Sequence, residues 1–378
     1  MSIAAGICVA NIYYNQPILS AIANDVHLTD KEAGNLPVLS QAGYGLGLFF
    51  LTPLGDRMDR KKLIIVLQLC LIVTLVGISL VHTKAPLYIL SLVIGMLASA
   101  TQVILPMAAS MSVNNKGKNV GIVFTGLLIG ILGARIFSGY ITEWFSWQHV
   151  YLISAGLLVI TTCMISFQLP GLAPQYKGNY ISLLSSTVLQ IKRFSLLRRI
   201  SLLAIFMYGA FFSFWTTLTF HLSSAPFHYK SDTIGLFGVL AIGGALVTPV
   251  FGKLADKGNP AKNQLFSVSI IIISILLVQL FPSSIIAFIF TTLLMDIGVQ
   301  ATQISNIAQV YSLDETANSR INTMYMTLMF MGGAIGTWVG VKCWAAGGWS
   351  LVCWQMLLWV CAAMVVCIIS WKISVKGK

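Results

Sequence analysis

Long apolar stretches alternate with short polar breaks along the whole chain. A helix needs roughly 20 mostly apolar residues to cross a hydrocarbon core about 30 Å thick, and the stretches have about this length. The breaks, which are charged or rich in Pro and Gly, divide the chain into twelve predicted transmembrane helices. The first six cover residues 3–23, 34–54, 63–81, 87–111, 120–141 and 150–169. The second six cover residues 200–223, 233–251, 264–281, 285–310, 321–341 and 351–371.

One connection is much longer and more polar than the others. Residues 170–199 contain Pro174, Gly178 and five basic residues. We therefore predict an N-terminal six-helix half at 1–169, a cytoplasmic linker at 170–199 and a C-terminal six-helix half at 200–378.

Composition supports an all-α polytopic membrane protein. Hydrophobic residues make up 57% of the 378 residues, charged residues only 9%, and the mean hydropathy is +0.85. Soluble domains average about 45–50% apolar and about 25% charged residues. The lipid bilayer is therefore the expected surroundings of this chain.

The basic residues indicate the orientation in the membrane. With both termini in the cytoplasm, eighteen of the 23 Lys and Arg residues lie in inward-facing loops or the tail, and four face outward. This bias follows the positive-inside rule and predicts a multi-pass protein of the bacterial plasma membrane. It also explains the net charge of +12 without nucleic-acid binding.

The opening segment resembles a signal peptide at Ala21-Ile22-Ala23, but it lacks a basic n-region. Polar Asn11, Asn15 and Gln16 also interrupt its apolar run. We expect a membrane helix here. The chain begins almost at the membrane, which is compatible with a shortened or misassigned start.

The two halves repeat one another. Asp56 and Asp256 end the second and eighth helices, and Trp147 and Trp349 precede the sixth and twelfth, at offsets of 200 and 202. The tripeptide Ala-Thr-Gln recurs in the fourth and tenth helices, ending at Gln102 and Gln303. A parallel repeat of two six-helix halves is typical of a transporter whose substrate site lies between them.

The loop after the second predicted helix resembles a motif of a known family. The segment 54–62, Leu-Gly-Asp-Arg-Met-Asp-Arg-Lys-Lys, resembles the loop signature of the major facilitator superfamily, and residues 252–258 repeat it. The resemblance covers the whole chain and implies alternating access. The first copy departs from the pattern at Thr52 and Asp59, where Gly is usual, and Ser91 stands where proton-coupled members commonly carry Arg.

Two further segments narrow the resemblance. Residues 10–17, Ala-Asn-Ile-Tyr-Tyr-Asn-Gln-Pro, and 133–139, Gly-Ala-Arg-Ile-Phe-Ser-Gly, are similar to a bacterial branch of drug or sugar efflux permeases. The second segment occupies the place of the antiporter signature, with Arg135 where Pro is customary. The resemblance implies efflux.

The acidic residue at the end of the second helix suggests a conformational latch. A carboxylate there can cap the positive N-terminus of another helix on the cytoplasmic side. The predicted latch consists of Asp56, Arg57, Arg60, Lys61 and Asp256. The alternative is a solvated charge cluster that only sets topology.

Two charged residues are predicted to lie deep within spans. Asp296, on the tenth helix, is the one acidic residue placed there, and a buried carboxyl favours its protonated form. Proton coupling is the functional interpretation, and a neutral Asp bonded between packed helices is the alternative. Arg135, at a similar depth on the fifth helix, is its candidate counter-charge. Arg135 could equally bind an anionic substrate or backbone carbonyls.

Polar and aromatic residues mark the candidate substrate site. In the resembled fold the first, fourth, seventh and tenth helices line a central cavity. On the first helix, Asn11, Tyr14 and Asn15 share a face by helical spacing, with Tyr13 and Gln16 turned away. The other candidates are Gln102, Gln300, Gln303 and Trp215, the last within an aromatic-rich seventh helix. Interhelical hydrogen bonding and lipid-facing aromatic residues are the alternatives.

Motifs for other chemistry are missing from the sequence. No phosphate-binding Gly-x-x-x-x-Gly-Lys-Ser/Thr run and no metalloprotease or serine-hydrolase pattern is present. We therefore expect no enzyme, no cofactor and no metal site, and a monomer that draws energy from a gradient. The prediction is a secondary transporter that exports a small, amphipathic solute in exchange for protons. An importer or facilitator of a metabolite such as a sugar, and a non-transporting membrane sensor, are the alternatives.

Overall fold

The computed structural model describes residues 1–110, 116–171, 176, 178–241, 260–314 and 317–376. Within these ranges the regular structure is helical and contains no strand. The chain forms two compact units, one of Met1–Ser186 with Lys230–Gly235 and the other of Thr187–Tyr229 with Leu236–Lys378. Each unit is treated separately below.

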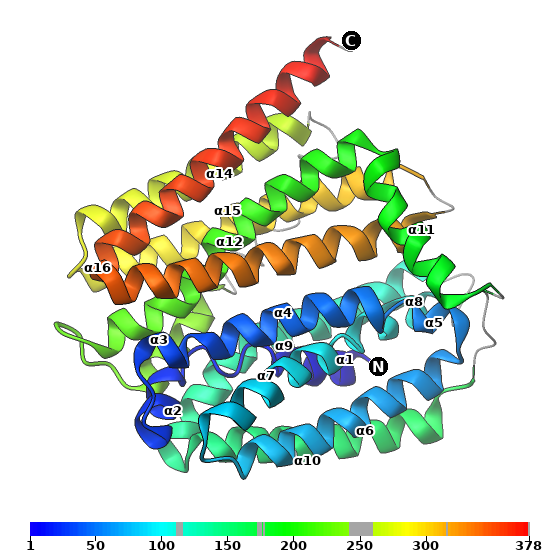
Figure 1. The fold of residues 1–378 in the computed structure, drawn as a ribbon, viewed down its shortest axis with the longest axis horizontal. Helices are drawn as coiled ribbons and strands as arrows, with labels where there is room; N and C mark the ends of the chain where they lie inside the picture. Colours follow the sequence, from blue (N-terminus) through cyan, green and yellow to red (C-terminus); the bar gives the residue numbers. More distant parts are fainter. Residues whose placement is uncertain (111–115, 172–175, 177, 242–259, 315–316, 377–378) are drawn as a thin grey trace. The chain divides into compact units, whose positions relative to one another are not determined.

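The first unit is a bundle of long and interrupted helices (Figure 1). Its elements in chain order are α1 (Ser2–Ala10), α2 (Leu19–Val26), α3 (Asp30–Ala33), α4 (Asn35–Phe50), α5 (Leu54–Arg57), α6 (Arg60–Ser79), α7 (Lys84–Ala98), α8 (Thr101–Ser110), α9 (Lys116–Trp144) and α10 (Trp147–Gln168). The helix α11 (Tyr180–Arg193) crosses the boundary between the units. Helices α6 and α10 lie side by side in this bundle.

The first predicted span is interrupted in its middle. Helix α1 ends at Ala10, α2 begins at Leu19, and residues 11–18 form consecutive turns. Several backbone bonds there join residues three apart, as in Tyr13 N to Ala10 O at 2.9 Å. Two causes are local: Pro17 has no N–H to donate, and Asn11 donates its side-chain Nδ2 to Ile7 O at 2.8 Å.

Small residues allow the helices of the first unit to approach closely. A Cβ placed on Gly95 of α7 would lie 2.0 Å from Ser40 O of α4, and one on Gly130 of α9 would lie 2.2 Å from Gly6 O of α1. Any side chain there would force the backbones apart. Such close backbone contact is the usual way in which membrane helices pack without a hydrophobic driving force between them.

The second unit contains four long helices, which Figure 1 shows running alongside one another: α12 (Ser195–Ser223), α14 (Pro260–Leu280), α15 (Ile285–Tyr311) and α16 (Asn318–Lys376). Helix α16 is two helices joined across Gly347 and Gly348, whose backbone is not helical. Gly348 has φ 61, a conformation that favours glycine. This break lies between the predicted eleventh and twelfth spans.

Eight helices among the described residues are long and apolar enough to cross a membrane. They correspond to nine of the twelve predicted spans, because α16 contains two and α7 with α8 makes one. The first span is divided by its polar break, and the second, α4, has only 16 residues. The eighth predicted span, 233–251, is described only up to Ala241, within the short helix Ser231–Ala241.

Large apolar side chains cover the outer surfaces of these helices. Phe167 of α10 is 89% exposed, and Val73 of α6, Leu280 of α14 and Leu358 of α16 are similarly exposed. Soluble monomers rarely carry so much apolar surface. The exposed residues therefore face lipid, as expected for a polytopic membrane protein.

Candidate functional site

The break between α1 and α2 carries a buried polar cluster. Asn11 accepts a hydrogen bond from Ser154 Oγ of α10 at 3.0 Å, while its Nδ2 donates to the α1 backbone. The Tyr14 hydroxyl also bonds Ser154, and the Tyr14 ring lies 5.6 Å from that of Phe137 on α9. The Asn11 amide is thus engaged at both of its ends within the first unit.

Asn15 points to a different neighbour. Its Nδ2 donates to Ser40 Oγ of α4 at 3.1 Å, and its buried Oδ1 accepts no hydrogen bond from the described residues. The sequence places Asn11, Tyr14 and Asn15 on one helical face. In the structure Asn11 and Tyr14 contact α10 and Asn15 contacts α4, because residues 11–18 do not form an α-helix.

Arg135 lies inside the span Gly121–Trp144 and is 2% exposed. Its Nε donates to Gln16 Oε1 at 2.9 Å, and its guanidinium carbon lies 5.2 Å from the centre of the Tyr13 ring. Both contacts come from the break in the first span. Sequence reasoning did not assign these two residues to the site, although a charge inside a span needs polar contacts.

An open groove runs between α1 and α9 beside this cluster. Its volume is about 220 Å³, and its lining is mostly apolar. Gly6, Ala10 and Tyr14 line it from the first span, and Gly133, Ala134 and Phe137 line it from α9. Pockets for drug-sized ligands have volumes of about 300–1,000 Å³, so this groove is large enough for only part of such a solute.

Gln102 and Gln303, the paired residues of the repeat, each bond a buried tyrosine within their own unit. Gln102 Nε2 donates to the Tyr44 hydroxyl at 3.2 Å, and Gln303 Oε1 accepts from the Tyr325 hydroxyl at 2.6 Å. Both glutamines, like Gln300, are half-buried. The tyrosines are partners that the sequence analysis did not identify.

Asp296 lies in α15 of the second unit and is 3% exposed. The structure thus confirms that it is buried in a span. Arg135 belongs to the first unit, so the ion pair between Asp296 and Arg135 stays a prediction.

The aromatic side chains of the seventh predicted span are largely buried in the protein. Trp215, Phe211, Phe212, Phe214 and Phe220 of α12 are all buried. Trp215 contacts the rings of Phe211 and Phe214. Because they are packed inside the protein, these residues are not the lipid-facing surface that the sequence left as an alternative.

The predicted latch forms a small network within the first unit. Asp56 Oδ1 and Arg60 Nη2 make an ion pair at 3.0 Å, and Asp56 O accepts from Tyr176 N at 2.9 Å. Lys61 N donates to Asp59 Oδ1, which caps α6. Arg57 is exposed, and Asp256 lies outside the described residues. A contact of Asp56 with the second unit stays a prediction.

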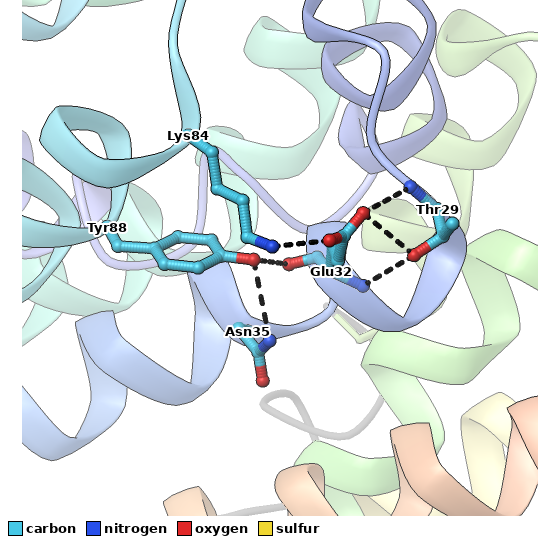
Figure 2. Close-up of polar contacts among 5 residues, drawn as sticks. All are labelled: Thr29, Glu32, Asn35, Lys84 and Tyr88. Carbon is cyan, nitrogen blue, oxygen red and sulfur yellow. Dashed lines mark hydrogen bonds and ion pairs between the residues drawn. The ribbon is translucent and has the colours of Figure 1, made fainter.

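A second polar network joins α3 to the start of α7 (Figure 2). Glu32 accepts from Thr29 N and Oγ1 and pairs with Lys84 Nζ at the start of α7. The Tyr88 hydroxyl donates to Glu32 O at 2.8 Å. The Lys84 ammonium foremost, with the Thr29 N–H and hydroxyl, lowers the pKa of Glu32 to about 2. No group of three potential metal ligands occurs within the described ranges.

Comparison with known proteins gives one consistent family. The family model of the Major Facilitator Superfamily matches residues 1–341. Transporter YgaY of Escherichia coli (strain K12) is 32% identical over 93% of this chain and 90% of its own length. Transporter SCO4007 of Streptomyces coelicolor is 26% identical over 96% of this chain and 86% of its own length.

Solved structures share the fold at low sequence identity. A mutant of the nucleoside transporter NupG aligns with TM-score 0.74 and 13% identity, covering 97% of this chain and 98% of its own. A bacterial homologue of the lysosomal transporter Spinster aligns with TM-score 0.76 and 12% identity, covering 99% and 95%. Family model, relatives and fold agree: the chain belongs to the major facilitator superfamily and is a multi-pass membrane transporter of that type.

Proposed function

We propose that this transporter is a secondary active exporter that moves a small, amphipathic solute out of the cell in exchange for protons. Alternating access between its six-helix halves, at 1–169 and 200–378, would carry the solute through the bacterial plasma membrane, with both termini in the cytoplasm. A monomer contains both halves. The resemblance of residues 10–17 and 133–139 to efflux permeases supports the outward direction.

The groove between α1 and α9 is the observation that carries the proposed substrate class. Its apolar lining suits a hydrophobic group of the solute. Tyr14 lines the groove and belongs to the polar break in the first span, so the groove adjoins this break. The buried Asn15 Oδ1 of that break needs a hydrogen-bond donor, which a polar group of the solute would supply. A solute with an apolar and a polar part matches this pair of surfaces.

Interrupted membrane helices commonly form the substrate and ion sites of transporters. Tyr14 and Asn15 are the proposed contacts in the break of the first span, and Asn11 holds this break to α10. Gln102, Gln300, Gln303 and Trp215 are the further proposed contacts.

Asp296 is the proposed proton carrier, with Arg135 as its counter-charge. An ionisable residue within a membrane span is expensive to bury and is commonly part of an ion or proton pathway. Alternating protonation of Asp296 would weaken and restore its attraction to Arg135 as the solute leaves and binds. The Asp56 network would stabilise one end state on the cytoplasmic side.

The test is a proton-flux assay in vesicles. Purified protein is reconstituted with an imposed proton gradient and a pH-sensitive dye, and ethidium, arabinose and isoleucine are added in turn. Ethidium should dissipate the gradient, and Asp296→Asn should abolish this flux while leaving ethidium exchange at equal pH intact. Unchanged proton-coupled flux in Asp296→Asn would refute the assignment of the proton carrier. Dissipation by arabinose alone would replace the amphipathic substrate class with sugars.

A further inference from the structure

The break in the first span has two functional sides. One carries Tyr14, which lines the groove, and Asn15. The other carries Tyr13 and Gln16, which contact Arg135. Gln16 and Tyr13 are three residues apart in a segment without α-helical structure, and both are buried. The same short segment therefore contacts both the proposed solute groove and the buried arginine.

The contacts of Arg135 with the break orient its side chain without cancelling its charge. A glutamine carbonyl is a neutral acceptor, and an aromatic face attracts a cation through its quadrupole. The guanidinium is planar and has donors in fixed directions. Because Nε is bonded to Gln16, the position of the break constrains the orientation of the guanidinium plane.

We propose that Gln16 is the positioning residue of Arg135, and that solute binding at Tyr14 and Asn15 acts on Arg135 through Gln16. A small displacement of the break moves the Gln16 amide and with it the guanidinium. Gln16 thereby sets the pH dependence of transport, although it contacts neither the solute nor the proton. This inference rests on the proposed function for its transport consequences, but the positioning itself has an independent test.

Gln16→Met is the decisive variant, because it keeps the length of the side chain and removes the amide. Gln68→Met is its matched control. Gln68 is another buried glutamine of the first unit, accepts from Thr162 Oγ1 at 3.1 Å and lies on α6. Gln16→Glu retains an acceptor for Arg135 but adds a negative charge, so it separates the position of the guanidinium from its uncancelled charge.

The first measurement needs no solute. Protein labelled with ¹⁵N in its arginines is studied by NMR in micelles, and the Arg135 Nε–H signal is assigned by its loss in Arg135→Lys. This proton should exchange slowly with water in the wild type, in Gln68→Met and in Gln16→Glu. Its exchange should accelerate about tenfold or more in Gln16→Met, which loses a hydrogen bond to a charged group. Equal exchange in Gln16→Met and the wild type would overturn the positioning role.

The second measurement is proton-driven ethidium efflux against pH. Gln16→Met should lower the maximal rate about tenfold and shift the pH profile, with little change in half-saturating ethidium. Gln16→Glu should not recover the rate, because its carboxylate cancels the charge of Arg135, and Gln68→Met should retain the wild-type profile. A wild-type profile in Gln16→Met, despite a freed Nε–H, would refute the link to transport. If the wild type moves no ethidium, the proposed substrate class fails, and Nε–H exchange still decides the positioning.

Discussion

The Tyr325 hydroxyl donates a hydrogen bond of 2.6 Å to Gln303 Oε1, joining α16 to α15 in the second unit. The same hydroxyl accepts from Asn306 Nδ2 at 3.1 Å, and Asn306 Oδ1 accepts from Gln264 Nε2 of α14 at 2.7 Å. Three helices are thus joined by one chain of polar side chains around a fully buried tyrosine. Gln303, a proposed solute contact, is held in place by this chain.

Tyr325→Phe should destabilise the second unit. The substitution leaves the buried amide of Asn306 and the half-buried amide of Gln303 each without one partner, and the buried group alone costs about 1–3 kcal/mol. Thermal unfolding of the protein in detergent measures the change. Tyr311→Phe is the control, because Tyr311 is 49% exposed at the end of α15. Equal unfolding temperatures for the two variants would show that the polar chain contributes nothing.

A larger residue at Gly133 should obstruct the groove between α1 and α9. A Cβ at Gly133 meets no atom within 4 Å, so a leucine there fits without moving a helix. Because Gly133 lines the groove, the leucine side chain should fill part of it. It should raise half-saturating ethidium about tenfold or more, because a few buried CH₂ groups of the solute lose their contacts. Saturation curves for ethidium efflux give this value.

Gly121→Leu is the matched control for the groove. Gly121 lies on the same helix, also has open space at its Cβ, and does not line the groove. Both substitutions favour helix formation equally. If half-saturating ethidium changes to the same extent in both variants, the groove is not the binding surface.

The membrane fold could be predicted from the sequence because hydrocarbon thickness imposes a fixed helix length. Most span positions agree with the helices to within a few residues, as in α10 and α14. The break at 11–18 could not be derived from periodicity, since the run is apolar on both sides of it. Pro17 and the clustered amides were the available signals.

The sequence predicted the two buried charged residues of the candidate site, but not the residues that contact them. Arg135 and Asp296 stand out because a charge within an apolar run is costly. Gln16 was expected to turn away from Tyr14 and Asn15, but its contact with Arg135 was not predicted, because Arg135 lies on a distant segment. Tyr325 and Ser154 gave no signal, since a hydroxyl in an apolar run is common and its partner lies on a distant segment.

Glu32 should make stability depend on pH in a defined acidic range. Its pKa falls from the ordinary 4.5 to about 2 in the folded protein, chiefly through Lys84. A depressed carboxyl pKa stabilises the fold above about pH 4.5, and this contribution is lost as pH falls toward 2. The wild type should therefore unfold at a higher temperature than Glu32→Gln at pH 6, and the difference should shrink between pH 4.5 and pH 2.

A double variant isolates this contribution. Glu32→Gln in a Lys84→Met background removes a carboxylate that has already lost its main partner (Figure 2). Its effect on unfolding temperature should be smaller than in the wild-type background, and 1 M salt should weaken the wild-type effect as well. An effect of equal size in both backgrounds would contradict the role of the ion pair.

Asp56 and Asp59 should act on different properties although they are three residues apart. Asp56 pairs with Arg60 at 3.0 Å, whereas Asp59 caps α6 by accepting from Lys61 N at 2.9 Å. If Asp56 belongs to a latch, Asp56→Asn changes the balance between the inward-open and outward-open conformations. The ethidium flux should then fall several-fold while the affinity for ethidium is unchanged. Asp59→Ala loses a helix cap and should lower stability by about 1 kcal/mol. Flux, equilibrium binding and thermal unfolding of both variants separate these effects. Wild-type flux in Asp56→Asn would contradict the latch. The charged residues would then only orient the chain in the membrane, because orientation requires positive residues and no carboxylate.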